Sequence, residues 1–335
     1  MRPNRDLPTV WERSQRRSRR YGGPVVRPAP PPVTPVVALV GPTATGKSAV
    51  SLALARALDG EVVNADSMQL YRGLDIGTAK LTPEQRQGIP HHALDLWAVT
   101  EPASVAEYQA VARAAIDDVI ARGRTPLLVG GSGLYVRAVL ERFEFPGTDP
   151  RLRERLEAEL AAAGPAPLYE RLRGLDPEAA SRILPSNGRR IVRALEVVEL
   201  TGSPFVAALP EPRPHYRSVQ VGLDLDARQL DDRIAARVDG MWAAGLVDEV
   251  RALETVGLRD GRTASRALGI QQVLRHLAGE CSLAQARSDT IAATRRFVRR
   301  QRSWFRRDPA IHWLDAAGPD LVDRCLAVLA APATR

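Results

Sequence analysis

The segment Gly-Pro-Thr-Ala-Thr-Gly-Lys-Ser at residues 41–48 constrains the fold of this chain more than any other. It matches the pattern G-x-x-x-x-G-K-[ST], and it lies between a short β-branched apolar segment, 36–40, and a helical pattern that continues to Leu58. Such a loop needs a strand before it and a helix after it, because N–H groups of the loop and of the helix N-terminus together surround an anion. The match therefore predicts a phosphate-binding P-loop, of the type that binds ATP, in an α/β domain.

The loop residues have separate roles in binding a phosphate group. Backbone N–H groups bind the anion, the Lys47 ammonium neutralises phosphate oxygens, and the Ser48 hydroxyl is a ligand for Mg²⁺. Lysine is rare in this chain, since all 47 basic residues except Lys47 and Lys80 are arginine. A chain with this usage retains lysine where a compact ammonium is required. We therefore predict a phosphate site with Mg²⁺ as its cofactor, formed by Gly41, Pro42, Thr43, Ala44, Thr45, Gly46, Lys47 and Ser48.

Strand and helix patterns alternate along the first part of the chain. Residues 61–65 read as a buried strand that ends at Asp66, and residues 126–129 read as another that leads into Gly-Gly-Ser-Gly at 130–133. A capping box formed by Ser104 and Glu107 opens a helix between them. This alternation predicts a mainly parallel sheet covered by helices on both faces. Because the carboxyl ends of such strands face the ligand, Asp66 is expected near the phosphates.

The pattern changes after about Phe143. Short helices rich in Arg, Glu, Ala and Leu follow, and no strand is indicated until residues 219–223. Amphipathic helices are then expected at about 228–255, 266–278 and 283–306. We predict a core domain of residues 35–143 and 214–335, interrupted by a helical insertion of residues 144–213.

Positive charge is concentrated at the N-terminus. Of the net charge of +8, residues 1–34 contribute +6 from eight arginines and two acids, in a segment that is also rich in proline. We predict that residues 1–34 are disordered. Three interpretations of this tail stay open: an electrostatic contact with RNA, an incidental extension, and a start codon placed too early.

Composition excludes several classes of protein. No apolar run reaches the roughly 18 residues of a membrane span, so we expect no membrane association and a cytoplasmic location. The two cysteines form no CxxC or Cys/His cluster, which argues against a zinc site or a disulfide framework. A P-loop kinase or nucleotide hydrolase remains an alternative, although no run of four apolar residues is followed by a convincing metal-binding aspartate of the usual type; the obvious acid is Asp66, which closes the second strand.

Several further motifs resemble one family. They are found at 41–48, at 66–71 (Asp-Ser-Met-Gln-Leu-Tyr), 75–80 (Asp-Ile-Gly-Thr-Ala-Lys), 130–135 (Gly-Gly-Ser-Gly-Leu-Tyr), 189–197 (Arg-Arg-Ile-Val-Arg-Ala-Leu-Glu-Val), 266–271 (Arg-Ala-Leu-Gly-Ile-Gln) and 300–306 (Arg-Gln-Arg-Ser-Trp-Phe-Arg). In this order, over about 36–315, the chain resembles the tRNA dimethylallyltransferase family. It departs from the family pattern at Ile270, where tyrosine is common, and at Leu81, where proline is usual.

The resemblance implies a reaction. A dimethylallyl group would pass from dimethylallyl diphosphate to the exocyclic N6 amine of the adenosine 3′-adjacent to the anticodon. Asp66 is then the candidate base, because the delocalised amine of adenine is a poor nucleophile until its proton is removed. Lys47, the loop amides, Mg²⁺ and Arg237 would stabilise the leaving diphosphate, with a hydroxyl contact from Thr43.

The resemblance also implies that the anticodon stem-loop of tRNA is bound, in part by the helical insertion of residues 144–213, with the reacting adenosine unstacked. The implied contact residues are Asp66, Ser67, Met68, Gln69, Ser132, Arg153, Arg189, Arg190, Ile191, Val192, Arg193, Arg266, Ala267, Leu268, Gly269, Ile270 and Gln271. Independently, residues 287–307 hold eight arginines and one acid, and a stripe of Arg295, Arg299, Arg302 and Arg306 is predicted to contact phosphates.

Two other functions stay open, an isopentenyltransferase acting on free adenine nucleotide and a P-loop RNA-binding protein without catalysis. The helical insertion and the arginine-rich helix argue against the first, and Asp66 with Arg237 argues against the second. We expect a monomer.

Overall fold

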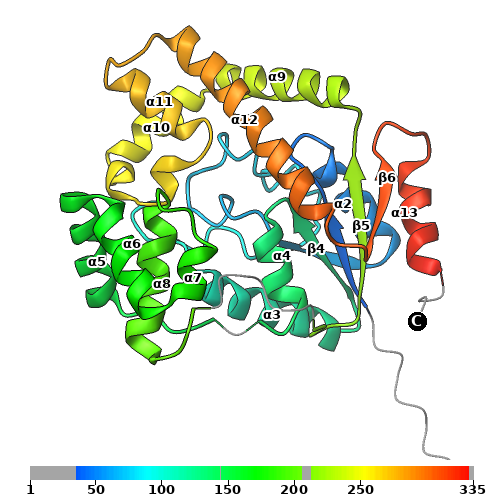
Figure 1. Ribbon diagram of the computed structural model, residues 1–335. Coiled ribbons are helices and arrows are strands. Elements are labelled where there is room, and N and C mark those ends of the chain that lie inside the picture. Colours follow the sequence, from blue (N-terminus) through cyan, green and yellow to red (C-terminus); the bar gives the residue numbers. More distant parts are fainter. Residues whose placement is uncertain (1–34, 144, 206–212, 332–335) are drawn as a thin grey trace, which may run out of the picture. The chain divides into compact units, whose positions relative to one another are not determined.

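Parallel strands lie at the centre of the structure, a computed structural model that describes residues 35–143, 145–205 and 213–331. In these residues six strands form one sheet in the order β3-β2-β4-β1-β5-β6, and all neighbours are parallel (Figure 1). The strands are β1 (Val36–Val40), β2 (Gly60–Asn64), β3 (His91–His92), β4 (Thr125–Gly130), β5 (Ser218–Asp224) and β6 (Ile311–Asp315). The predicted disordered tail, residues 1–34, lies outside the described residues.

Helices connect and cover the strands. They are α2 (Lys47–Ala57), α3 (Val105–Ala121), α4 (Gly133–Leu140), α5 (Pro150–Ala163), α6 (Pro165–Leu175), α7 (Pro177–Ser181), α8 (Gly188–Thr201), α9 (Ala227–Ala243), α10 (Leu246–Glu254), α11 (Ile270–Leu277), α12 (Leu283–Phe305) and α13 (Leu321–Ala330), with 3₁₀ turns η1 (Leu258–Asp260) and η2 (Ala264–Arg266). The predicted cap of α3 is present, since the Ser104 side chain accepts a hydrogen bond from the Glu107 N–H at 3.3 Å.

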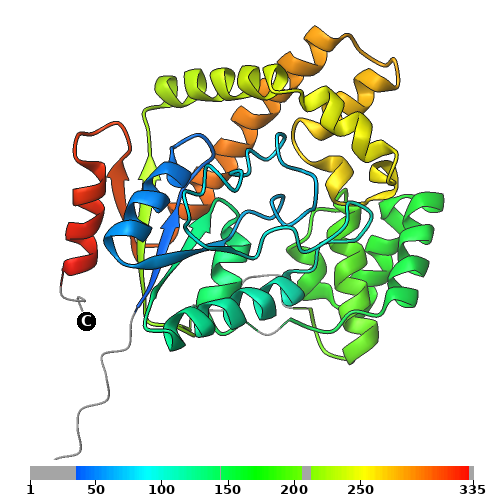
Figure 2. The same ribbon diagram turned by 180° about the vertical axis from the view of Figure 1, so that it is seen from behind.

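Burial on both faces explains the continuous apolar run of β1. Its even-numbered residues, 36, 38 and 40, belong to a buried cluster shared with α3 and α4. Val37 and Leu39 belong to a second cluster, shared with α2 and α13. Figures 1 and 2 show α13 alongside β6 at one edge of the sheet. The predicted fold class, a parallel P-loop-type sheet with helices on both faces, is therefore confirmed.

The helical pattern after β5 differs in detail from the prediction. The helix expected at 228–255 is divided into α9 and α10, because Gly245 adopts a left-handed conformation (φ 95°) that ends the first helix. The helix expected at 266–278 begins only at Ile270, after η2. The prediction also missed β3, β6 and α13. The two-histidine strand β3 is too short to show a strand pattern, and the apolar residues of β6 are interrupted by His312.

The helices α5–α8 have a small apolar cluster of their own, which includes Leu156, Leu172 and Leu195. In both views they lie at the end of the molecule away from α13 (Figures 1 and 2). The described residues form one compact unit, in which these helices are included. The predicted division into an insertion of 144–213 and a core of 35–143 and 214–335 therefore stays a prediction.

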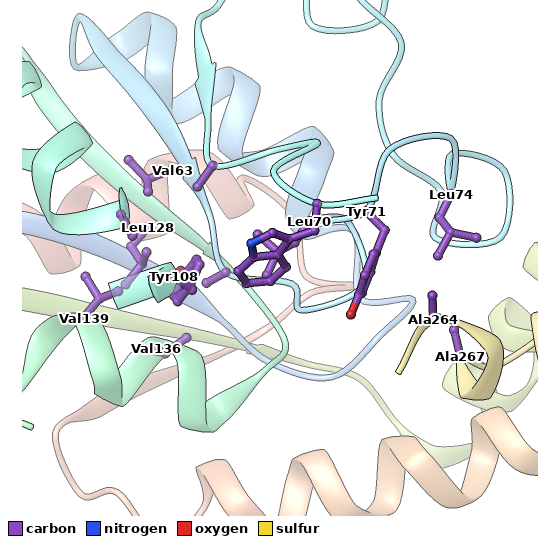
Figure 3. Close-up of a cluster of buried hydrophobic side chains, with 14 of the residues drawn as sticks. Val63, Leu70, Tyr71, Leu74, Tyr108, Leu128, Val136, Val139, Ala264 and Ala267 are labelled. Carbon is purple, nitrogen blue, oxygen red and sulfur yellow. The ribbon is translucent and has the colours of Figure 1, made fainter. Parts of the chain in front are cut away.

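The larger cluster fixes the segment that follows β2. Tyr71 and Leu74 are fully buried in it, and Figure 3 shows them on the side of Ala264 and Ala267. At the other end, the buried Tyr108 hydroxyl on α3 donates a hydrogen bond to the Asn64 carbonyl at 2.8 Å. Both contacts hold the chain on either side of Asp66.

Tyr108→Phe tests this anchor. We expect the free energy of unfolding to fall by about 1–2 kcal/mol, because the buried carbonyl of Asn64 loses its hydroxyl donor. The matched control is Tyr216→Phe, whose hydroxyl bonds Asp117 at 2.8 Å near the surface, where water can replace it. Denaturant unfolding of both variants is the measurement, and equal losses would contradict the special role of the buried bond.

Candidate active site

The loop of residues 41–48 is shaped to surround an anion at the start of α2. Ala44 and Gly46 both have left-handed backbone conformations, with φ of 71° and 89°. Gly41 cannot be replaced without strain, since a Cβ atom there would lie 2.3 Å from the Leu223 carbonyl oxygen. No described side chain caps the N-terminus of α2, and its first turn holds no acid. The amides of this turn are therefore left to bind a ligand.

Lys47 points back into the loop. Its Nζ donates a hydrogen bond to the Pro42 carbonyl oxygen at 2.7 Å. Burial lowers the pKa of Lys47 from 10.5 to about 8, although the charge of Asp66 partly opposes this shift and Arg237 adds to it. The buried Lys47 ammonium therefore lacks a full counter-charge from the protein, and a bound phosphate group would supply it.

A cavity of about 730 Å³ brings most of the predicted chemistry together. This volume is within the range of sites for small ligands. The predicted site residues that line it are Thr43, Ala44, Gly46, Lys47, Ser48, Asp66, Gln69 and Arg237. The expectation that Asp66 lies near the P-loop therefore agrees with the structure.

Asp66 is held in place by backbone and side-chain amides. Its Oδ1 accepts a hydrogen bond from the Met68 N–H at 3.0 Å, and its own N–H donates to Asn64 Oδ1 at 2.9 Å. Asn64 is buried and also donates to the carbonyls of Asp66 and Ala93. Among the described residues, no hydrogen bond is found for Oδ2 of Asp66. One carboxylate oxygen is thus fixed, while the second is available to a substrate.

Two arginines of α9 reach the cavity. Arg237 donates to the Thr78 carbonyl at 3.0 Å, and burial lowers its pKa, although it stays charged at neutral pH. Arg233 lies one turn earlier and lines the same cavity. Its Nη1 is 4.0 Å from the position that a Cβ atom on Gly46 would occupy. Sequence reasoning missed Arg233, although the four-residue spacing to Arg237 places both on one helical face.

The cavity is also lined by residues of the segment 75–80, which is held in place by side chains of other parts of the chain. Both oxygens of the Glu249 carboxylate on α10 accept hydrogen bonds from the N–H groups of residues 75, 76 and 77, at 3.0, 2.6 and 3.0 Å. The buried Lys80 ammonium binds Asp75 at 2.6 Å and Asp95 at 2.5 Å. The second lysine of the chain therefore has a structural role, and the segment is fixed at both of its ends.

Part of the predicted tRNA-contact set lies beside Asp66. The Ser67 N–H donates to Ser132 Oγ at 3.1 Å, which joins the carboxyl ends of β2 and β4. Gln69 donates to the Thr78 carbonyl at 3.2 Å. Met68 packs against the large apolar cluster.

The rest of the set is divided between surface and core. In α8, Arg189 and Arg190 are exposed, whereas the Ile191 and Val192 side chains are buried. Arg153 and Arg193 both bind the buried Glu196. Of residues 266–271, Ala267, Gly269 and Ile270 are buried. The departure at Ile270 is therefore placed in the apolar core, and direct contact with tRNA stays a prediction for the exposed neighbours.

The predicted arginine stripe on α12 is mostly engaged with acids of the protein. Arg302 and Arg306 bind Asp224 at 2.9 and 3.1 Å, and Arg295 binds Asp231 at 3.4 Å. These pairs hold α12 against β5 and α9. Of the stripe, only Arg299 forms no ion pair among the described residues. The predicted contact of the stripe with phosphates stays a prediction, and Arg299 is the member best able to make it. Phe305 is buried, as expected for a core residue.

Together, the fold and the cavity define a P-loop α/β protein whose anion site faces a carboxylate and two arginines. Comparison with known proteins gives the family. Residues 69–308 match the family model described as IPP transferase, and the chain belongs to this family.

Named relatives agree with this family. The chain is 74% identical over 300 residues to the tRNA dimethylallyltransferase of Salinispora tropica, which covers 90% of this chain and 94% of the relative. It is 64% identical over 299 residues to that of Thermobifida fusca, covering 88% and 94%.

Solved structures of the family have the same fold. The tRNA isopentenylpyrophosphate transferase of Bacillus halodurans matches with a TM-score of 0.66 at 40% identity, covering 88% of this chain and 94% of that one. A eukaryotic dimethylallyltransferase acting on tRNA matches with a TM-score of 0.74 at 26% identity, covering 88% and 77%.

Lys47→Met tests the charge state of the loop. Between pH of about 8 and 10.5 the folded protein releases the Lys47 proton while the unfolded chain keeps it, so this residue makes stability rise with pH over that window. We expect Lys47→Met to be more stable than the parent at pH 7.5 by about 1–3 kcal/mol and to lack this rise. Denaturant unfolding at pH 7.5 and 10 is the measurement, and parallel pH dependence in the two proteins would disprove the shift.

Proposed function

We propose that this chain is a tRNA dimethylallyltransferase, which transfers a dimethylallyl group from dimethylallyl diphosphate to the N6 amine of the adenosine 3′-adjacent to the anticodon. The observation that supports this proposal best is the single cavity that Asp66 shares with Lys47, Arg237 and the start of α2. A carboxylate facing an anion site suits transfer of an alkyl group away from diphosphate. Membership of the IPP transferase family and relatives named for this activity support the same reaction.

The residues fit the two halves of this reaction. The bond between the allylic carbon and the diphosphate oxygen breaks, and the leaving group gains negative charge beside Lys47, Arg237 and the amides of α2. The adenine N6 forms the new bond to carbon, and its proton passes to the free oxygen of Asp66. Thr43 lines the cavity, and its hydroxyl is proposed to bond the diphosphate.

Mg²⁺ is the proposed cofactor, and the donors of the loop fit it. Within the described residues no group of three or more His, Cys, Asp or Glu side chains could hold a metal ion. A magnesium ion here would take its ligands from Ser48, from the diphosphate and from water, as Mg²⁺ commonly does. When bound, it would neutralise charge on the leaving group.

The tRNA side of the proposal rests on groups around Asp66 and on exposed arginines. Ser67, Gln69 and Ser132 lie beside the carboxylate, where the unstacked adenosine would enter. Arg189 and Arg190 lie on the exposed side of α8. No helix of the described residues is long and apolar enough to cross a membrane. The cytoplasmic location and the monomeric state remain proposals.

A direct assay tests the reaction. Incubation with dimethylallyl diphosphate, Mg²⁺ and unmodified tRNA should yield N6-dimethylallyladenosine in nucleoside mass analysis. A parallel reaction with free AMP should give no product, because AMP lacks the phosphates of neighbouring tRNA nucleotides that the exposed arginines would bind. Product from AMP alone would favour the free-nucleotide transferase, and ATP hydrolysis without prenylation would favour a P-loop hydrolase.

Asp66→Asn tests the base. We expect turnover to fall by about 10²–10⁴-fold, because the amide cannot accept the N6 proton. Binding of tRNA and of inorganic diphosphate should change less than about threefold, since the amide oxygen can still accept the Met68 N–H. The control is Asp59→Asn, an exposed carboxylate before β2 that pairs with Arg124. Loss of binding with residual turnover would assign Asp66 to anchoring instead.

A further inference from the structure

Gln301 on α12 lies against the P-loop, far from it in sequence. Its side chain is buried, with 5% exposure. Its Oε1 accepts a hydrogen bond from the Thr43 N–H at 3.0 Å, and its Nε2 donates to the Gly131 carbonyl at 2.8 Å. Both ends of one amide are therefore bound to backbone atoms of two different loops of the active site.

Two glycines, which have no Cβ atom, leave the space for this side chain and for the neighbouring Trp304. A Cβ atom on Gly131 would lie 2.4 Å from Gln301 Nε2, and one on Gly133 would lie 2.0 Å from Trp304 Nε1. The Gly-Gly-Ser-Gly segment after β4 and the Arg-Gln-Arg-Ser-Trp segment of α12 thus fit into each other. Neither glycine has a positive φ among the described residues, so close packing against α12, rather than backbone conformation, requires them.

The hydrogen bond to Thr43 determines which amides of the P-loop can bind an anion. A donor that is bound to Gln301 is not available to a phosphate, so the anion must be held by the amides from Ala44 onward. The same bond fixes the backbone of Thr43, which lines the cavity. On the other side, Gly131 precedes Ser132, which bonds Ser67 beside Asp66. Gln301 therefore connects the phosphate-binding loop with the residues around the proposed base.

We propose that Gln301 is a positioning residue for prenyl transfer, which holds the P-loop in register with the ends of β2 and β4. In this role it aligns the diphosphate with the acceptor amine, although it touches neither. The inference rests on the proposed function, because it assigns the loop to a leaving diphosphate. Small displacements of reacting groups reduce rates strongly, which is why a residue behind the loop can influence turnover.

Gln301→Met keeps the volume and removes both hydrogen bonds. We expect it to bind inorganic diphosphate about tenfold more weakly, measured by calorimetry with Mg²⁺. For prenyl transfer, kcat/KM for dimethylallyl diphosphate should fall by about 10–100-fold, while KM for tRNA changes less than about threefold. The matched control is Phe305→Leu, one turn later on α12, whose side chain is buried in the large apolar cluster, of which no residue of 41–48 is a member. It should lower the melting temperature while diphosphate binding stays at the parent value.

Gln301→Glu gives a second, pH-dependent test that does not rely on the first variant folding. Its ionised carboxylate can still accept the Thr43 N–H, but it faces the Gly131 carbonyl without a proton to donate. When protonated it has the shape of glutamine and a donor. Diphosphate affinity relative to the parent protein should therefore rise as pH falls from 8.5 to 6.

The outcomes separate the two proposals. A parent protein that does not bind diphosphate would overturn the proposed function. A parent that binds it, together with a folded Gln301→Met of unchanged diphosphate affinity and kcat/KM, would overturn the role of Gln301. If Gln301→Met does not fold, the role of Gln301 would be overturned by a Gln301→Glu variant whose diphosphate affinity relative to the parent does not change between pH 8.5 and 6.

Discussion

A buried positive charge without a full counter-charge is the constraint on which this structure depends. Lys47 lies in a loop of backbone donors at the uncapped start of α2, and burial lowers its pKa to about 8. The sheet determines where this charge is placed, because the carboxyl ends of β1, β2 and β4 meet at one edge. Asp66 is brought to the same edge by β2, but it does not form an ion pair with Lys47 among the described residues. The site is therefore arranged to receive an anion from outside.

Close backbone approach around this edge explains two glycines of the sequence in physical terms. Gly41 lies against the Leu223 carbonyl, and a Cβ atom on Gly130 would lie 2.2 Å from the Ala65 carbonyl oxygen. The first contact brings the loop after β1 close to β5, and the second brings the end of β4 close to the segment after β2. The helix α12 then lies across the edge, bound through Gln301 and through the pairs of Arg302 and Arg306 with Asp224 (Figure 1).

Local signals in the sequence were enough to predict the centre of the site. A strand, a glycine-rich loop and a helix lie next to each other in the chain, and the position of Asp66 follows from the direction of parallel strands. Contacts between distant segments could not be predicted in this way. Glu249 binds the N–H groups of residues 75–77 from more than 170 positions away, and backbone partners of a side chain leave no spacing pattern.

Two sequence predictions were incomplete for a related reason. The arginine stripe of α12 is visible in the sequence, but the acids that pair with it, Asp224 and Asp231, come from other elements and are not. In α8, the residues Ile191 and Val192 belong to its apolar face, together with Leu195, and their helical spacing could have shown that their side chains face a core. Family motifs mark positions in the chain, but they do not tell which side chains reach a ligand.

The proposed use of the P-loop is consistent with its charge in the free protein. Phosphoryl transfer requires groups that act on phosphorus and on an attacking oxygen. In this cavity the carboxylate comes from the segment after β2 and not from the loop, with one oxygen fixed by the Met68 N–H and the other unbound among the described residues. That arrangement suits an acceptor amine that loses a proton while the loop holds a departing diphosphate. Because Lys47 and Arg237 are buried before the ligand arrives, their field needs little reorganisation as the carbon–oxygen bond breaks, and the stability lost by burying them is regained when negative charge develops there.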